Sequence, residues 1–109
     1  MESQFKRGIL DACALAVLES GESYGYQLVK DISQFIEITE STLYPILKRL
    51  ETQDLVTVVS REHNGRLRKY YSINDKGRAH VTELLNEWSE IVKIYQYIVA
   101  EREKRNDKE

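Results

Sequence analysis

Apolar residues recur along the chain with two different periods, which predict three short helices, two strands and a long final helix. From Arg7 to Glu19 they are dense enough for a mostly buried helix, and Gly21 can end it in a left-handed conformation. Ser23 is a suitable N-cap for a second helix. Because Gly25 lowers the helix propensity of its first turn, we expect it to allow close packing against a neighbouring segment. The apolar stripe of this helix is Tyr26, Leu28, Val29 and Ile32.

A third helix is predicted from an N-cap at Thr39 or Ser41 to about Gln53. Pro45 removes one helix hydrogen bond and is expected to bend the first turns. Four apolar residues with the spacing i, i+3, i+4, i+7 form one inward face: Leu43, Ile46, Leu47 and Leu50. The opposite side is polar and holds Ser41, Pro45, Lys48 and Thr52, flanked by Tyr44 and Arg49.

After the third helix the pattern changes to one that is typical of strands. Val56–Ser60 is rich in β-branched residues, and Arg68–Ile73 contains two tyrosines. Asn64-Gly65 lies between the two segments and is a strong hairpin signal, because both residues tolerate a positive φ. The stretch Arg61–Lys69 carries four cations and one carboxylate, so the net charge of −2 conceals a local basic cluster.

The last helix is predicted to begin at Asn74 or Asp75 and to run to about Lys104, with residues 105–109 as a frayed tail. At about 1.5 Å per residue it would reach about 45 Å, beyond the diameter of so small a domain. Leaving its apolar stripe in water would cost about 1.5–3 kcal/mol for each large residue. We therefore expect this stripe to be the interface of a homodimer. It consists of Leu84, Leu85, Trp88, Ile91, Val92, Tyr95 and Ile98.

Composition narrows the class of protein. A chain of 109 residues fits one domain with a modest core, and no apolar run reaches the ~18 residues of a membrane-spanning helix. The N-terminus lacks the layout of a signal peptide, so we expect a cytoplasmic location. The single cysteine, Cys13, excludes a disulfide within the chain. No cation adjoins it to activate a thiolate, so a small core residue is favoured over a redox sensor.

An enzyme is not expected. His63 and His80 are the only histidines, and neither has matched metal ligands at a suitable spacing. There is no glycine-rich phosphate loop, and no cofactor or metal is predicted. His63 could contact phosphate when protonated, but a solvated loop residue is the simpler interpretation.

Helix, turn, helix and then a basic hairpin is the layout of a winged helix, so the predicted fold is mainly α with a small β-hairpin. Residues 1–74 would form a winged helix-turn-helix DNA-binding domain, and residues 75–104 a C-terminal dimerisation helix. In this fold the third helix enters the major groove, and the hairpin wing lies along the backbone or the minor groove. The candidate DNA contacts are Ser41, Thr42, Tyr44, Lys48, Arg49, Arg66, Arg68 and Lys69.

Four segments carry a family resemblance: Tyr24–Leu28, Ser41–Glu51, Gly65–Tyr71 and Asp75–Gly77. Through them, over about residues 8–100, the sequence resembles the PadR family of bacterial transcriptional regulators. It is most similar to the short members with a single C-terminal helix, such as the multidrug-sensing repressors. The resemblance implies a homodimer whose third helices enter successive major grooves of double-stranded DNA. With it, Tyr24 joins the candidate DNA contacts. Tyr44 and Lys48 match family positions that face DNA, and Arg66 and Lys69 match the cationic wing.

The resemblance also bears on Trp88. In the multidrug-sensing members a tryptophan at the matching position lines a pore between subunits and stacks on flat aromatic ligands. Trp88, with Tyr95 as a possible neighbour, is thus a candidate effector site. The alternative is that Trp88 only packs the dimer, since a large apolar residue is expected at this place in the stripe.

Together these features predict a sequence-specific regulator, a homodimeric repressor with a pseudo-palindromic operator, whose DNA affinity a small aromatic effector would lower. The alternative is a winged-helix module that binds another protein and not DNA. A basic hairpin favours DNA, since a protein-binding module has little use for cations around Asn64-Gly65. Binding that weakens steeply with salt would distinguish the two.

Overall fold

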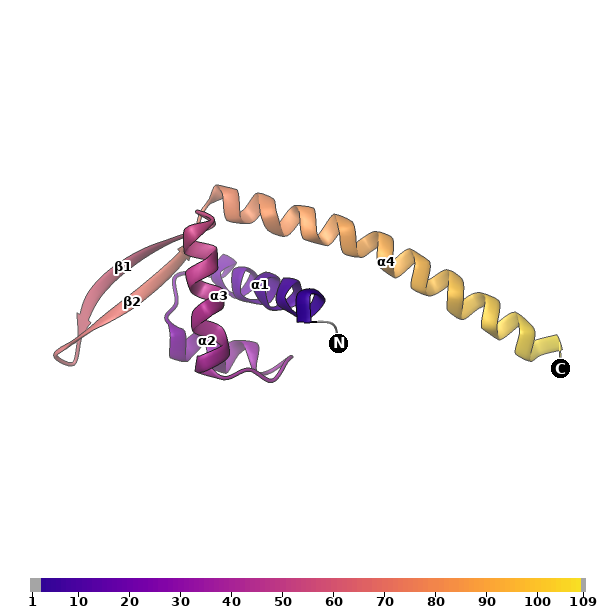
Figure 1. The fold of residues 1–109 in the computed structure, drawn as a ribbon, viewed down its shortest axis with the longest axis horizontal. Coiled ribbons are helices and arrows are strands. Elements are labelled where there is room, and N and C mark those ends of the chain that lie inside the picture. Colours follow the sequence, from indigo (N-terminus) through magenta and orange to yellow (C-terminus); the bar gives the residue numbers. More distant parts are fainter. Residues whose placement is uncertain (1–2, 109) are drawn as a thin grey trace.

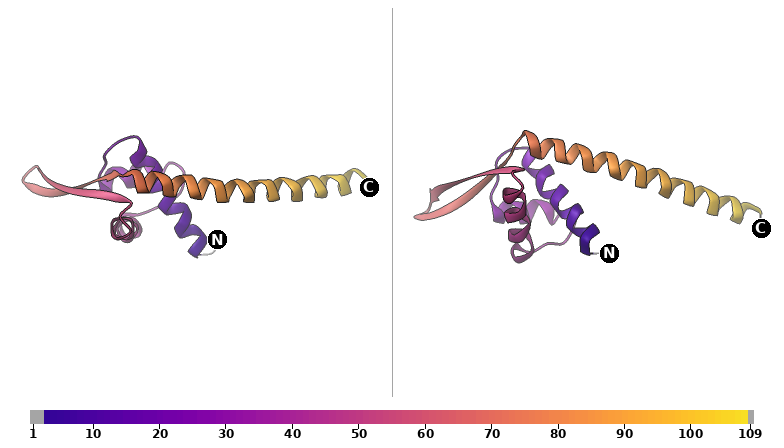
Figure 2. Two further views of the ribbon diagram at one scale, coloured as in Figure 1. Left: turned by 90° about the horizontal axis from the view of Figure 1, so that it is seen from above. Right: turned by 45° about the horizontal axis from the view of Figure 1, so that its top comes forward.

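The computed structural model describes residues 3–108, and its elements follow the predicted order (Figure 1). The fold is mainly helical, with one antiparallel hairpin and a long C-terminal helix, as the sequence predicts. Figures 1 and 2 show the hairpin and the last helix leaving the helical head in opposite directions. The elements are α1 (Ser3–Glu19), α2 (Gly25–Ile32), α3 (Glu40–Thr52), β1 (Val56–His63), β2 (Arg66–Ile73) and α4 (Asp75–Lys108).

The core lies where α1, α2 and α3 meet the base of the hairpin. Leu15, Leu28 and Leu47 are fully buried there, one from each helix. The predicted inward face of α3 is confirmed, because all four of its apolar residues are buried. Cys13 packs against the core with partial exposure, and burial raises the pKa of its thiol. Because a raised pKa leaves less thiolate, this environment favours the core interpretation of Cys13.

The helix caps explain two of the predicted boundaries and correct a third. Thr39 caps α3, since its Oγ1 accepts a hydrogen bond of 3.3 Å from the Thr42 amide. Asn74 caps α4 in the same way, through a bond of 2.8 Å from the Gly77 amide. The prediction that Ser23 caps α2 is wrong, because Tyr24 occupies that position. The Ser23 backbone instead pairs with Tyr71 as a short antiparallel bridge.

The hairpin is longer than predicted, but its turn is the expected one. Asn64 and Gly65 have φ values of 53° and 80°, which suit a tight two-residue connection. Val56 pairs with Ile73 at the base and His63 with Arg66 at the tip. The base is buried and the outer half is exposed, so the hairpin projects from the head as a wing.

The last helix begins on the base of the hairpin and then leaves the head. A Cβ at Gly77 would collide with the Leu55 carbonyl oxygen, so only glycine allows this close approach. Val81 is buried in the core, whereas most residues beyond it are exposed. None of the helices in the described part of the chain combines the length and apolar character needed to span a membrane.

The predicted end of this helix near Lys104 is wrong, because α4 continues to Lys108. Fraying of the tail stays a prediction, and Glu109 lies outside the described residues. The tail is rich in Glu, Lys and Arg, which have good helix propensity. Lys104 also pairs with Glu101 one turn earlier.

Candidate nucleic-acid interface

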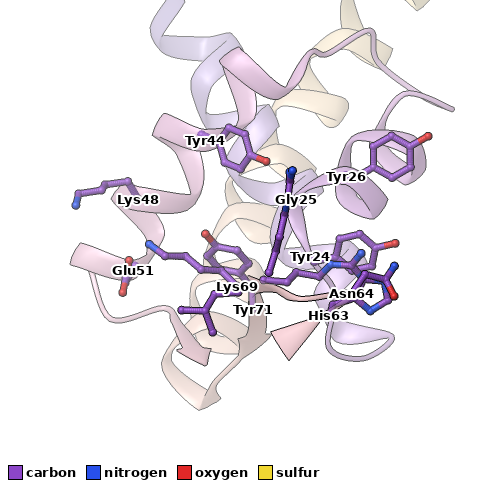
Figure 3. A pocket seen from close by; sticks show the side chains of 13 residues that line it. Tyr24, Gly25, Tyr26, Tyr44, Lys48, Glu51, His63, Asn64, Lys69 and Tyr71 are labelled. Atoms are coloured by element: carbon purple, nitrogen blue, oxygen red, sulfur yellow. The ribbon is translucent and has the colours of Figure 1, made fainter. Parts of the chain in front are cut away.

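A groove of about 720 Å³ runs between the outward face of α3 and the hairpin (Figure 3). Such a volume would suit a small ligand. The groove is open to solvent, however, and lies between a helix and a hairpin. A long molecule, such as a nucleic-acid duplex, could therefore also enter it. It is lined by Tyr24, Gly25, Tyr26, Tyr44, Lys48, Glu51, His63, Asn64, Arg66, Leu67, Arg68, Lys69 and Tyr71.

Six of the nine predicted DNA contacts line this groove. They are Tyr24, Tyr44, Lys48, Arg66, Arg68 and Lys69. Ser41 and Thr42 lie at the N-terminal end of α3, where both are exposed but outside the groove. The Thr42 hydroxyl lies 3.2 Å from that of the capping residue Thr39. The positive end of the α3 dipole therefore lies beside two hydroxyl groups, a suitable place for a phosphate.

Tyr44 is held at the mouth of the groove by two neighbours. Its ring lies against Gly25, where a Cβ would come within 2.9 Å of the Tyr44 ring and hydroxyl. The prediction that Gly25 allows close packing is thus confirmed. The Tyr44 hydroxyl donates a hydrogen bond of 3.5 Å to the Glu40 carboxylate. Partial burial and the nearby Glu40 charge raise the pKa of Tyr44 above its ordinary 10.0, in keeping with a protonated hydroxyl that donates to this carboxylate.

The cations of the groove are of two kinds. Arg68 is half-buried, and its guanidinium carbon lies 3.9 Å from the centre of the Tyr24 ring, within cation–π range. Lys48, Arg66 and Lys69 are exposed, and the described residues provide none of them with a salt bridge. These three are free to meet an external anion. Glu51 is the only carboxylate among the lining residues, so the groove is basic.

Arg49 lies apart from the other predicted contacts. Its guanidinium donates a hydrogen bond to the carboxylate of Asp11 on α1, and the Arg49 side chain is 28% exposed. Burial raises the pKa of Asp11, and the Arg49 charge opposes this shift. The main contact of Arg49 is thus within the protein, where it ties α3 to α1. Sequence reasoning placed Arg49 beside the polar face because nothing local reveals a partner 38 residues away.

Sequence reasoning also missed a side-chain cluster at the hairpin, in which Glu22 of the head contacts Arg61 and Arg61 contacts Tyr70. Glu22 forms a two-pronged ion pair with Arg61, with both N–O distances 2.6 Å. The Arg61 guanidinium lies 4.6 Å from the centre of the Tyr70 ring, which in turn packs edge-on against Tyr24. The basic stretch was visible in the sequence, but the acidic partner of Arg61 lies in the turn before α2. No local pattern joins the two segments.

Among the side chains that the structure describes, no group of three His, Cys, Asp or Glu residues is placed to hold a metal ion. The chemistry available in the groove is that of recognition: ammonium and guanidinium groups for anions, and tyrosine rings and hydroxyls for stacking and hydrogen bonds.

Comparison with protein families identifies the relatives of this fold. The model of the transcriptional regulator PadR-like family matches residues 14–83, which include α2, α3 and the entire hairpin. The chain belongs to the PadR-like family. The resemblance seen in the sequence is thereby confirmed, and the match ends just after the first turns of α4, where the helix leaves the head.

Individual proteins are similar to this chain over most of its length. The solved structure of smu.1704 from Streptococcus mutans UA159 is 39% identical and superposes with a TM-score of 0.76, covering 85% of this chain and 88% of the other. The transcriptional regulator Rv3488 of Mycobacterium tuberculosis is 32% identical over 73% of this chain and 76% of its own length. Bacillus subtilis PadR, solved in complex with operator DNA, is 26% identical with a TM-score of 0.66, covering 71% of this chain and 46% of that protein.

Proposed function

We propose that this protein is a sequence-specific, homodimeric DNA-binding repressor of transcription. The observation that carries the proposal is the basic groove between α3 and the hairpin, with three exposed cations and four tyrosines. Membership of a family of transcriptional regulators supports it, as does a relative that was solved with operator DNA.

Each wall of the groove has its own part in this proposal. Lys48 and Tyr44 project from α3 and would contact base edges and phosphates in the major groove. Arg66 and Lys69 on the wing would neutralise phosphates of the flanking backbone. Ser41 and Thr42 would bind one further phosphate at the start of α3. Arg68 would mainly hold the Tyr24 ring in place. Arg49 would contribute by holding α3 against α1.

The exposed stripe of α4 is the proposed dimer interface. Leu85, Ile91, Val92, Tyr95 and Ile98 keep between 48% and 66% of their surface exposed in the single chain. Leu84 and Trp88 are half-buried. A contiguous apolar row of this length favours a partner helix, and two copies related by a two-fold axis would cover both rows. Two α3 helices would then face a pseudo-palindromic operator.

A small aromatic effector is the regulatory part of the proposal. Trp88 and Tyr95 lie on α4, whose stripe would close around such a molecule between two subunits. Binding there would lower DNA affinity if the dimer that holds the effector presents its α3 helices at a different spacing. Trp88 is the only tryptophan of the chain, so quenching of its fluorescence by planar cationic drugs or phenolic acids would report binding directly.

A gel shift tests the proposed function as a whole. The full chain is mixed with DNA from upstream of its own gene and with a duplex pool of random sequence, at 50 and 200 mM salt. We expect a retarded complex that selects particular sequences and weakens by at least tenfold between the two salt concentrations, because several phosphates are contacted. No complex with any duplex at 50 mM salt would contradict the proposal and favour a protein-binding module.

A further inference from the structure

The wing, formed by β1 and β2, contacts the head through several side chains to which the proposed DNA-binding function assigns no role. Its base is held by core packing and by the backbone bridge between Ser23 and Tyr71, with N–O distances of 3.1 and 2.8 Å. Further out, the side-chain contacts recorded for the described residues come from Glu22 and Tyr24. Both residues belong to the short segment between α1 and α2.

Arg61 and Arg68 face each other directly across the two strands. Two like charges at such a cross-strand position repel one another unless each has a partner. Here Arg61 is paired with the Glu22 carboxylate, and Arg68 lies on the Tyr24 ring. Tyr70 lies between these partners, with its ring under Arg61 and its hydroxyl 3.4 Å from the Arg68 guanidinium. The contacts therefore form one continuous cluster of five side chains.

We propose that the Glu22–Arg61 ion pair is a wing-positioning contact that sets the distance between the wing and α3, and that Arg61 is not itself a DNA contact. This inference rests on the proposed DNA-binding function. A two-stranded hairpin alone is marginally stable, so its outer half needs an external support to hold one orientation. A carboxylate that accepts hydrogen bonds from a guanidinium with both oxygens fixes the relative orientation of the two side chains as well as the distance between them. Arg61 is already engaged in this way, whereas Arg66 and Lys69 are free to bind phosphate.

Two substitutions of opposite charge distinguish a wing-positioning role of the Glu22–Arg61 pair from direct contact between Arg61 and DNA. Glu22→Gln removes one negative charge from the wing side of the protein, and Arg61→Gln removes one positive charge. If Arg61 contacted phosphate, the first change would leave binding unchanged or strengthen it, and the second would weaken it. If the pair positions the wing, both changes weaken binding. Only positioning predicts the same result from opposite charge changes.

The experiment measures binding by fluorescence anisotropy on a duplex selected from random sequence by the wild-type protein, over a range of salt concentrations. We expect Glu22→Gln and Arg61→Gln each to weaken binding by about three- to tenfold, with the slope of affinity against salt unchanged. The charge swap of Glu22→Arg with Arg61→Glu should restore most of the loss. Glu83→Gln makes the same charge change on an exposed residue of α4, the helix that leaves the head in the direction opposite to the wing (Figure 1), and should not weaken binding.

Thermal midpoints measured in parallel separate positioning from folding, since both side chains are partly exposed and the variants are expected to fold. The inference is overturned if Glu22→Gln binds as well as the wild type or better, or if Arg61→Gln lowers the salt slope by about one per subunit. It is also overturned if the charge swap binds no better than the single variants. Selection of the duplex by the wild type tests the DNA-binding function first, so a failure there is distinct from a failure of the positioning role.

Discussion

The Tyr44 ring of α3 lies directly against the backbone of Gly25, the first residue of α2. The backbone of Gly25 does not have a positive φ, so its conformation does not require glycine. A side chain is excluded because the Tyr44 ring fills the space that it would occupy. A Cβ would lie 2.9 Å from two atoms of Tyr44, and the flexible tyrosine side chain is the group that can move. Two helices of the head thus fix a candidate DNA contact between them.

This relationship predicts that Gly25→Ala weakens DNA binding through Tyr44. The added methyl group should turn the ring away from its position at the groove, with little loss of stability because about half of Tyr44 is exposed. We expect a loss of affinity close to that of Tyr44→Ala, and no further loss when the two changes are combined. Anisotropy titrations give the affinities. Gly8→Ala is the control, since a Cβ there has nothing within 4 Å.

Lys48→Ala should weaken binding on specific and scrambled duplexes and flatten its salt dependence. Removing one phosphate contact lowers the slope of log affinity against log salt by about 0.9, so the two copies in a dimer should lower it by about two. Lys76→Ala removes the same charge from the exposed first turn of α4, outside the groove, and should leave the slope unchanged. An unchanged slope for Lys48→Ala would remove Lys48 from the DNA-facing surface.

Arg49→Met should destabilise the protein in a pH-dependent way. Burial already raises the pKa of Asp11 from its ordinary 3.8. Removing Arg49 takes away a hydrogen bond and a positive charge that both lower this pKa. The variant therefore contains a buried carboxylate without its partner, which should cost about 1–3 kcal/mol in the free energy of unfolding at pH 7. As the pH falls through the raised pKa of the folded state, Asp11 takes up a proton and the deficit should shrink.

Urea denaturation of the wild type and of Arg49→Met, at pH 7 and near pH 4, gives the difference in their free energies of unfolding directly. Asp11→Asn provides the control, because the Arg49→Met penalty should be smaller when no carboxylate is present. A deficit that stays constant with pH would show that Arg49 acts through packing alone.

Ile91→Asp should convert the protein to a monomer. Ile91 is exposed on the apolar stripe of α4, where a carboxylate would lie inside the proposed interface without a partner. Asn86→Asp introduces the same group on the opposite side of the helix and should leave the dimer intact. Sedimentation velocity measures the result. If Ile91→Asp and the wild type sediment alike, the stripe does not hold two subunits together.

The elements and the core were predictable from the sequence because their signals are local. The spacing of Leu43, Ile46, Leu47 and Leu50 identifies the buried face of α3, and Asn64-Gly65 identifies the hairpin turn. The errors arose where a tertiary contact overrides a local preference. Ser23 has the chemistry of an N-cap, but its backbone pairs with Tyr71, nearly fifty residues later in the chain.

The candidate site was predictable in part, for the same reason. Lys48 and Tyr44 share a helix face, and Arg66 and Lys69 flank a recognised turn, so their grouping follows from short-range geometry. The sequence contains no comparable signal for Asp11 beside Arg49 or Glu22 beside Arg61. These pairs decide which cations remain free, and only the three-dimensional structure brings their members together.

Lysine footprinting tests the central claim, that the groove between α3 and the wing meets DNA. The protein is acetylated briefly with and without a duplex that it has selected, and each lysine is quantified by mass spectrometry. We expect DNA to protect Lys48 and Lys69 strongly, while Lys93 and Lys104 on α4 react at the same rate in both samples. Equal reactivity of Lys48 and Lys69 with and without bound DNA would contradict the claim.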